Sequence, residues 1–168
     1  MLPEGFVFSQ GNLQDYVECA RRFELAYLQG LKWPAVQAEP ALEREAHMRQ
    51  GALFHKLVQQ HASGVPAEAL ARRVTQEPLR TWWANYQRVI VDLSAQRYVE
   101  VTLSAPLEGL GGVYRLVAKY DLVAIVPGER AVIVDWKTAA RASSHSQLET
   151  RLQTIVYRYL LEIGRAHV

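Results

Sequence analysis

Cysteine and long apolar runs are scarce in this chain. With one cysteine, the chain cannot form an internal disulfide. No stretch approaches the roughly 18 apolar residues that read as a membrane-spanning helix, and the N-terminal sequence MLPEGFVFSQ lacks the basic and then apolar pattern of a signal peptide. We therefore expect a cytoplasmic protein.

The chain has almost no excess of positive over negative charge. The net charge of +2 at pH 7 is too small to argue for a nucleic-acid partner by itself, and no segment resembles a basic arm. What the chain does have is 168 residues, of which 49% are hydrophobic and 21% charged. This composition is typical of a soluble globular domain with a substantial core.

The most informative stretch runs from Gly112 to Lys137. Two apolar runs rich in β-branched residues flank the sequence Pro-Gly-Glu-Arg at 127–130, and this pattern predicts a β-hairpin. Asp121 lies in the first run, and Asp135 and Lys137 end the second, where apolar residues are expected. These three ionisable residues therefore stand at positions of the hairpin where apolar side chains would be expected.

The register of the hairpin decides whether these groups meet. Asp135 and Lys137 are two residues apart and so share one face of a strand. If the loop is the odd-length Pro127–Glu129, Asp121 lies opposite Asp135. An even loop turns Asp121 to the other face unless a bulge corrects it.

Two interpretations of this group are open. One is a hairpin with a surface salt bridge, which is common and contributes little stability. The other is a site for a hard divalent cation, because carboxylates that are brought together normally pair or hold a metal. In that case a coordinated water is the nucleophile, and Lys137 orients it or neutralises charge on a phosphate.

The order Asp, β-turn, Asp-x-Lys resembles the motif of the PD-(D/E)XK nuclease superfamily. Asp121 matches the first acid, and Asp135, Trp136 and Lys137 match the (D/E)-x-K. The motif is short, so other parts of the chain have to support it.

Three further segments resemble the RecB-type exonuclease domains of this superfamily. A helix expected over 12–29, capped by its first residue and ended by a glycine, carries Tyr-x-x-Cys followed by a basic residue and Phe. A second helix contains Gly51-x-x-x-His55, and a third contains Gln153-x-x-x-Tyr157, whose two named residues share a helical face. A lone histidine on a helix is more often structural, but the hairpin favours His55 as a metal ligand.

The resemblance implies a fold and a chemistry. The fold is α/β with a restriction-endonuclease-like core, a central mixed β-sheet flanked by α-helices. The chemistry is metal-dependent hydrolysis of DNA phosphodiester bonds by a RecB-like exonuclease in DNA repair or recombination, with a helicase subunit or domain as a partner. The implied ligands of one or two Mg²⁺ or Mn²⁺ ions are His55, Asp121, Asp135 and the carbonyl of Trp136. The residues implied around the reacting phosphate are Asp121, Asp135, Lys137, Gln153 and Tyr157.

Four more residues are candidates for accessory roles. Arg21, Arg22 and Arg141 are expected to contact DNA, and Glu100 is expected to act as an accessory acid. An exposed arginine pair on an amphipathic core helix explains Arg21 and Arg22 equally well, and an exposed strand residue explains Glu100.

Cys19 bears on a possible iron–sulfur cluster. In AddB-type and CRISPR-adaptation nucleases, a cysteine at this place joins three near the C-terminus to hold such a cluster. Four thiolates are the usual requirement, so a cluster is not possible with Cys19 alone unless the native C-terminus is missing.

Two other functions share these residues. A catalytically inactive DNA-binding or scaffolding module of the same fold would keep the fold without the chemistry. A CRISPR-adaptation-type nuclease, or one that acts on RNA, would share the site and differ in substrate.

The domain plan follows from the same pattern. We expect a single nuclease domain over 1–162, truncated at its C-terminus, and a non-native tail over 163–168, because IGRAHV matches the translation of a sequencing adapter.

We expect a loop over 32–50 and a short helix or turn pair over 66–76. The expected strands lie near 98–105, 113–126 and 131–137. A buried helical face after Pro78 is predicted to contain Trp82, Trp83, Tyr86, Val89, Ile90 and Leu93.

Overall fold

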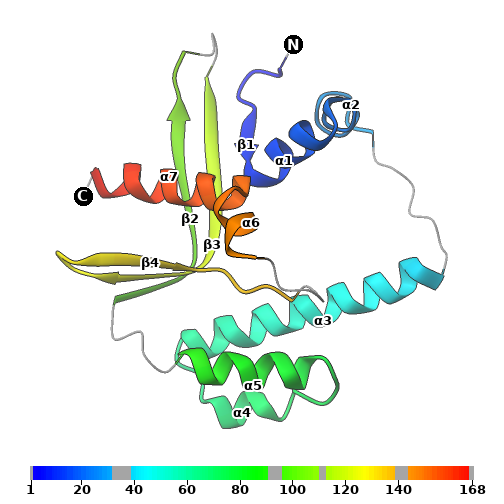
Figure 1. Cartoon of the computed structure of the whole chain (residues 1–168), viewed down its shortest axis with the longest axis vertical. Helices are drawn as coiled ribbons and strands as arrows, with labels where there is room; N and C mark the ends of the chain where they lie inside the picture. Colours follow the sequence, from blue (N-terminus) through cyan, green and yellow to red (C-terminus); the bar gives the residue numbers. More distant parts are fainter. Residues whose placement is uncertain (1, 32–38, 91–95, 110–112, 139–143, 167–168) are drawn as a thin grey trace. The chain divides into compact units, whose positions relative to one another are not determined.

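The computed structural model describes residues 2–31, 39–90, 96–109, 113–138 and 144–166. Figure 1 follows the chain through these residues and shows helices before and after a set of strands. None of the helices in the described ranges has the length and apolar content needed to cross a bilayer.

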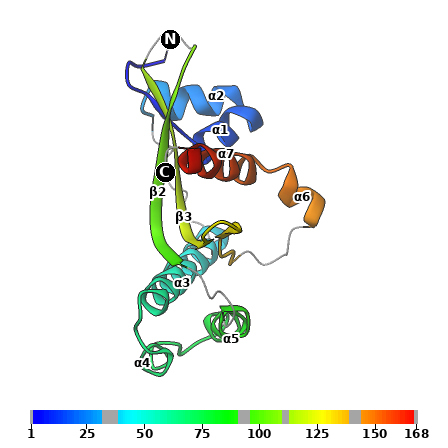
Figure 2. The same ribbon diagram turned by 90° about the vertical axis from the view of Figure 1, so that its left-hand side faces the viewer.

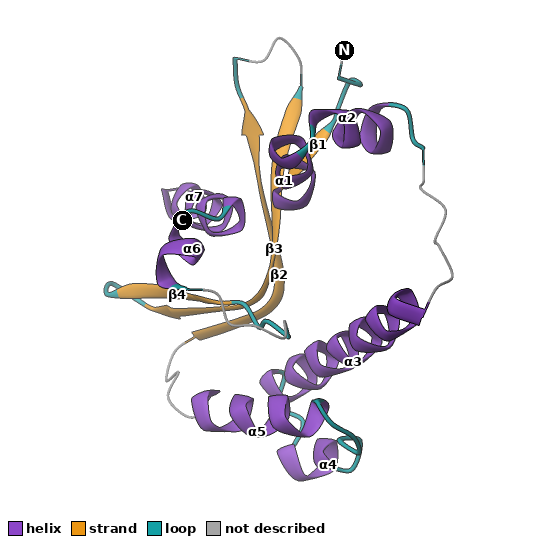
Figure 3. Ribbon diagram, turned by 45° about the vertical axis from the view of Figure 1, so that its right-hand side comes forward, coloured by secondary structure: helices purple, strands orange, loops and turns teal. Residues whose placement is uncertain are grey.

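The four strands form one mixed sheet, as the sequence predicts. The strands are β1 (Val7–Ser9), β2 (Gln96–Leu107), β3 (Tyr114–Val126) and β4 (Arg130–Val134). Strand β3 is central: it pairs in parallel with β1 and antiparallel with β4, and it lies beside β2. Figure 3 shows β2 and β3 as long neighbouring strands.

The chain forms two compact units, each assembled from separate segments. The first unit contains Met1–Pro34, Thr102–Lys119 and Arg141–Val168. The second unit contains Ala35–Val101 and Tyr120–Ala140. Strands β2 and β3 contribute residues to both units. The single domain expected over 1–162 stays a prediction.

The first unit carries the N-terminal and C-terminal helices. These are α1 (Gln10–Glu18), α2 (Ala20–Phe23), the π-helix η1 (Glu24–Leu28), α6 (His145–Glu149) and α7 (Leu152–Ala166). The continuous helix predicted over 12–29 is wrong in two respects. Ser9, not Asn12, caps α1, because the Asn12 side chain instead accepts the Ser9 N–H at 2.9 Å in a capping box. At Cys19 the backbone is extended (φ −161°), so the helix restarts there.

The second unit is built on the long helix α3 (Glu39–Ala62), followed by α4 (Ala67–Ala71) and α5 (Leu79–Val89). Helices α4 and α5 pack against α3, and Figure 2 shows the three together. The predicted loop over 32–50 is therefore wrong from residue 39 onward, whereas residues 32–38 lie outside the described part. Of the short helix and the turn pair expected over 66–76, the structure has the helix, at Ala67–Ala71.

The core of the second unit lies between these helices and the hairpin. Its buried members are Phe54, Leu57, Val58, Leu70, Leu79, Trp83, Tyr86, Ile90 and Leu122. The predicted apolar face of α5 is confirmed at Trp83, Tyr86 and Ile90, and Trp82 is partly buried. It is wrong at Val89, which is 67% exposed, and Leu93 lies outside the described residues. The apolar faces of α3 and α5 thus meet one face of the hairpin.

Candidate functional site

The hairpin has the loop and register that bring its two aspartates opposite each other. Strand β3 ends at Val126 and β4 begins at Arg130, so the loop is the three-residue Pro127–Glu129. Gly128 takes a left-handed conformation (φ +74°), which glycine adopts without steric cost. The last pair of the ladder is Leu122 with Val134, and continuing this register by one residue places Asp121 opposite Asp135. Of the two registers that the sequence left open, the structure has the one with the odd-length loop.

The two faces of the hairpin have different surroundings. Leu122 belongs to the core, and Val134 and Trp136 pack against it. The Trp136 ring lies edge-on to Tyr86, with 5.0 Å between ring centroids. Because side chains alternate along a strand, Asp121 belongs to the opposite face of β3 from Leu122. Strand β4 ends at Val134, so the strand predicted to reach Lys137 is three residues too long.

Asp121 contacts both the backbone of the segment that follows β4 and a histidine of α3. Its Oδ2 atom accepts the backbone N–H of Trp136 at 2.8 Å and lies 3.3 Å from His55 Nδ1 on α3. Burial tends to raise the pKa of Asp121, but the hydrogen bonds with His55 and Trp136 outweigh it and lower the pKa. The hydrogen bond with Asp121 raises the pKa of His55. The two side chains therefore stabilise each other's charged forms.

Asp135 and Lys137 form a second pair close to the first. Lys137 Nζ lies 2.6 Å from Asp135 Oδ2, with the lysine side chain 47% exposed and the aspartate side chain 23% exposed. The Asp135 charge contributes to raising the pKa of His55, and the Lys137 charge contributes to lowering the pKa of Asp121. The four groups therefore share one electrostatic environment. Within the described ranges, however, no three His, Cys, Asp or Glu side chains stand close enough to hold a metal ion in this conformation.

Gln153 and Tyr157 lie on α7 in the first unit. Gln153 donates from Nε2 to the Tyr157 hydroxyl at 3.1 Å, which confirms that the two share a helical face. The buried Tyr157 in turn donates its hydroxyl proton to the carbonyl of Lys119 at 2.6 Å. Lys119 lies two residues before Asp121 in the sequence, in the part of β3 that belongs to the first unit.

The arginines predicted to contact DNA are engaged with acids of their own segment. Arg21 pairs with Glu24 at 2.7 Å, and Arg22 pairs with Asp15 at 2.7 Å and also with Glu18. Their contact with DNA stays a prediction, as does that of Arg141, which lies outside the described residues.

Glu100 has an unusual backbone. It is half-buried in β2, and its backbone φ of +54° falls in the left-handed region that residues other than glycine rarely adopt. Residues with a strained backbone are often found at functional sites. The role of Glu100 as an accessory acid stays a prediction.

Sequence reasoning missed His47 of α3, and it named Gly51 without foreseeing its contact with the residue that follows the motif. His47 Nε2 lies 2.7 Å from the carbonyl oxygen of Thr138, the residue after Lys137. Gly51 is buried, and a Cβ atom added there would lie 2.9 Å from Thr138 Oγ1. The available signal was spacing, because His47, Gly51 and His55 follow one another at intervals of four and so share a face of a helix.

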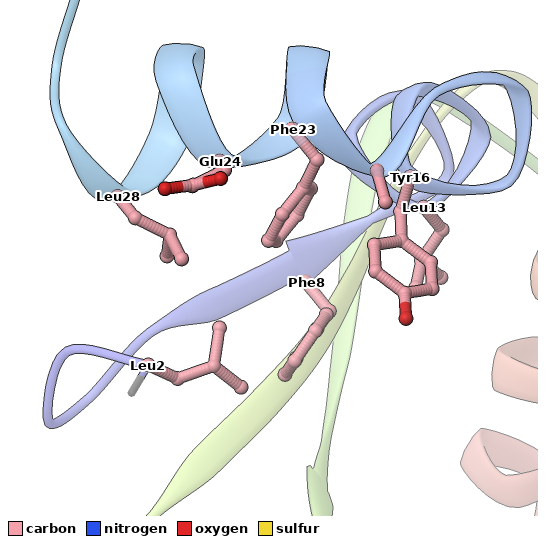
Figure 4. A pocket seen from close by; sticks show the side chains of 8 residues that line it. Leu2, Phe8, Leu13, Tyr16, Phe23, Glu24 and Leu28 are labelled. Atoms are coloured by element: carbon pink, nitrogen blue, oxygen red, sulfur yellow. The ribbon is translucent and has the colours of Figure 1, made fainter.

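The first unit contains an apolar pocket of about 480 Å³. Figure 4 shows side chains from β1, α1 and α2 turned toward it, among them Phe8, Tyr16 and Phe23. Its full lining is Leu2, Phe8, Leu13, Tyr16, Ala20, Phe23, Glu24 and Leu28. The lining contains one acidic side chain, Glu24, and no histidine, lysine or arginine.

The family model of the PD-(D/E)XK nuclease superfamily matches residues 7–167 of the chain. The chain therefore belongs to this superfamily, and the mixed sheet flanked by helices is consistent with its restriction-endonuclease-like fold. Comparison with curated proteins and with solved structures gives no significant match. Membership indicates a nuclease with DNA as its substrate, in a superfamily whose members typically use divalent metal ions such as Mg²⁺.

Proposed function

We propose that this chain is a Mg²⁺- or Mn²⁺-dependent DNA exonuclease of the RecB type that acts in DNA repair or recombination. The observation that carries the hydrolytic part is the meeting of Asp121, Asp135, His55 and Lys137 at the end of the hairpin. The RecB-type resemblance carries the exonuclease type, the pathway and the helicase partner or domain.

The donor types present fit a hard divalent cation. Carboxylate oxygens suit Mg²⁺ and Mn²⁺, and a neutral imidazole is a competent additional ligand. Asp121, Asp135, His55 and the carbonyl of Trp136 would hold one or two ions. Both carboxylates already have cationic or N–H partners on the protein, and the ion would take over part of that neutralisation. When bound, such an ion supplies Lewis acidity toward water and phosphate oxygens.

The chain's own residues orient the carboxylate and neutralise charge on the substrate. His55 and the Trp136 N–H fix the orientation of the Asp121 carboxylate. Lys137 is exposed enough to meet a phosphate from solvent, and its ammonium neutralises negative charge that develops there. The roles that we propose for Gln153 and Tyr157 in contacting DNA rest on the RecB-type resemblance.

Binding of DNA through its phosphates would make affinity strongly dependent on salt and weakly dependent on base sequence. We therefore expect cleavage of unrelated linear sequences at similar rates, and weaker binding as the salt concentration rises.

The test is degradation of end-labelled linear DNA, single- and double-stranded, with Mg²⁺, with Mn²⁺ and with chelator. The wild type is compared with Asp135→Ala and Lys137→Ala, and with Glu45→Gln as a control that removes an exposed acid from α3. We expect metal-dependent loss of DNA that both site variants reduce about 100-fold or more and that the control leaves intact.

The opposite result is equally clear. A folded wild-type protein that binds DNA in the presence of metal without cleaving it would support the catalytically inactive DNA-binding module instead. Cleavage that survives both site substitutions would place the hydrolytic centre elsewhere.

A further inference from the structure

The segment that carries Asp135 and Lys137 lies beyond the hairpin ladder. The last pair in that ladder is Leu122 with Val134, and residues 135–138 have no regular secondary structure. The position of this segment therefore depends on individual contacts. At its start, the Trp136 N–H donates to Asp121 and the Trp136 ring packs on Tyr86.

The end of the segment is held by helix α3. His47 Nε2 lies 2.7 Å from the Thr138 carbonyl oxygen, a distance typical of a hydrogen bond that the imidazole N–H donates. One turn further along α3, Gly51 leaves just enough room for the Thr138 side chain. One turn beyond that, His55 meets Asp121.

The orientation of His47 is itself supported from behind. Its ring lies edge-on to Trp82 of α5, with 5.2 Å between centroids and planes 87° apart. The imidazole is half-buried, so its hydrogen bond is partly shielded from water. These contacts fix where the ring nitrogen can point.

We propose that His47 is a positioning residue of the nuclease site. By donating its Nε2 proton to the Thr138 carbonyl, it fixes the end of the segment from which Asp135 and Lys137 project, and it ties that segment to the helix that presents His55. This role rests on the proposed function, because it is the geometry of the hydrolytic groups that His47 maintains. Small displacements of reacting groups lower rates steeply, by up to about 100-fold for about 1 Å.

Three variants separate positioning from simple stability. His47→Phe keeps a ring against Trp82 and removes the donor, whereas His47→Gln keeps an N–H donor near the place of Nε2. His61→Phe is the matched control: His61 also lies on α3 and also makes a partly buried hydrogen bond, to the Tyr86 hydroxyl at 2.7 Å.

The first readout is cleavage of linear DNA by the full chain at varied Mg²⁺ and DNA concentrations. For His47→Phe we expect kcat to fall about tenfold or more, a higher Mg²⁺ concentration at half-maximal rate, and a KM for DNA within about twofold of wild type. His47→Gln should stay within about threefold of wild type in kcat. His61→Phe should lower the melting temperature without moving the Mg²⁺ requirement.

The second readout needs no metal and no activity. Amide hydrogen exchange over residues 135–138 should quicken in His47→Phe relative to wild type, His47→Gln and His61→Phe. Unchanged exchange in His47→Phe, or unchanged kcat and Mg²⁺ requirement while the wild type cleaves DNA, would overturn the positioning role alone. A wild type that cleaves no DNA would overturn the proposed function, and the positioning role with it.

Discussion

At the scale of single residues, Asp121 joins three parts of the second unit. Its Oδ2 atom contacts His55 of α3 and the backbone N–H of Trp136, while the residue itself belongs to β3. The carboxylate thus has a structural role, as the acceptor of a backbone hydrogen bond, and a chemical role, as a negative charge. Different substitutions of Asp121 can remove one role or both.

Asp121→Asn and Asp121→Ala should differ in stability and agree in activity. An asparagine keeps an oxygen that accepts the Trp136 N–H, whereas alanine leaves that partly buried donor unpaired at a cost of about 1–3 kcal/mol. Both variants lose the charge, so both should lose nearly all cleavage. Urea unfolding measures the difference, and equal stabilities for the two variants would show that the Trp136 contact contributes nothing.

Glu100 offers a second test at the same scale. Its left-handed backbone (φ +54°) costs an L-residue roughly 1–2 kcal/mol, a cost that glycine avoids. Glu100→Gly should therefore be more stable than Glu100→Ala by about 1 kcal/mol, although both lose the same carboxylate. If Glu100 is an accessory acid, both variants should lose activity to a similar extent. Thermal unfolding that ranks alanine at or above glycine would contradict the strain.

At the scale of elements, α3 is the part that organises the site. One face of it presents His47, Gly51 and His55 to the hairpin and the segment that follows it. Its neighbouring face places Phe54, Leu57 and Val58 in the core. The helix therefore couples core packing to the position of a proposed metal ligand.

Gly51→Ala tests that coupling. A Gly-to-Ala change inside a helix ordinarily stabilises it by about 1 kcal/mol. Here the added Cβ would lie 2.9 Å from Thr138 Oγ1, so we expect a loss of stability and of cleavage instead. Thr138→Ala removes the colliding atom, and the double variant should recover much of both losses. Stabilisation by Gly51→Ala alone would show that Thr138 moves aside freely.

The sequence predicted the second half of α3 well, but it did not predict where the helix begins. The stripe at Phe54, Leu57 and Val58 is a clear helical signal. The first half of α3 gives none, because its apolar residues face water: Leu42 is 57% exposed and Met48 is 72% exposed. A helix without a buried stripe has no periodicity to read, and His47 went unnoticed for that reason.

At the scale of the whole molecule, the proposed groups are divided between the two units. The second unit holds His55, Asp121, Asp135 and Lys137, and the first holds Gln153 and Tyr157. The hairpin register could be reduced to two alternatives from the sequence, because the length of the turn fixes it locally. The parallel pairing of β1 with β3 could not be predicted, because three residues are too few to show a period and their partners, Arg115 to Val117, lie far along the chain.

The central claim is that the hairpin and α3 hold a divalent cation, and Mn²⁺ binding followed by electron paramagnetic resonance tests it most directly. We expect the wild type to bind one or two ions, Asp121→Asn and Asp135→Asn to bind them at least about tenfold more weakly, and Glu45→Gln to match the wild type. Binding that both aspartate variants leave unchanged, or no binding by folded wild-type protein, would contradict the account.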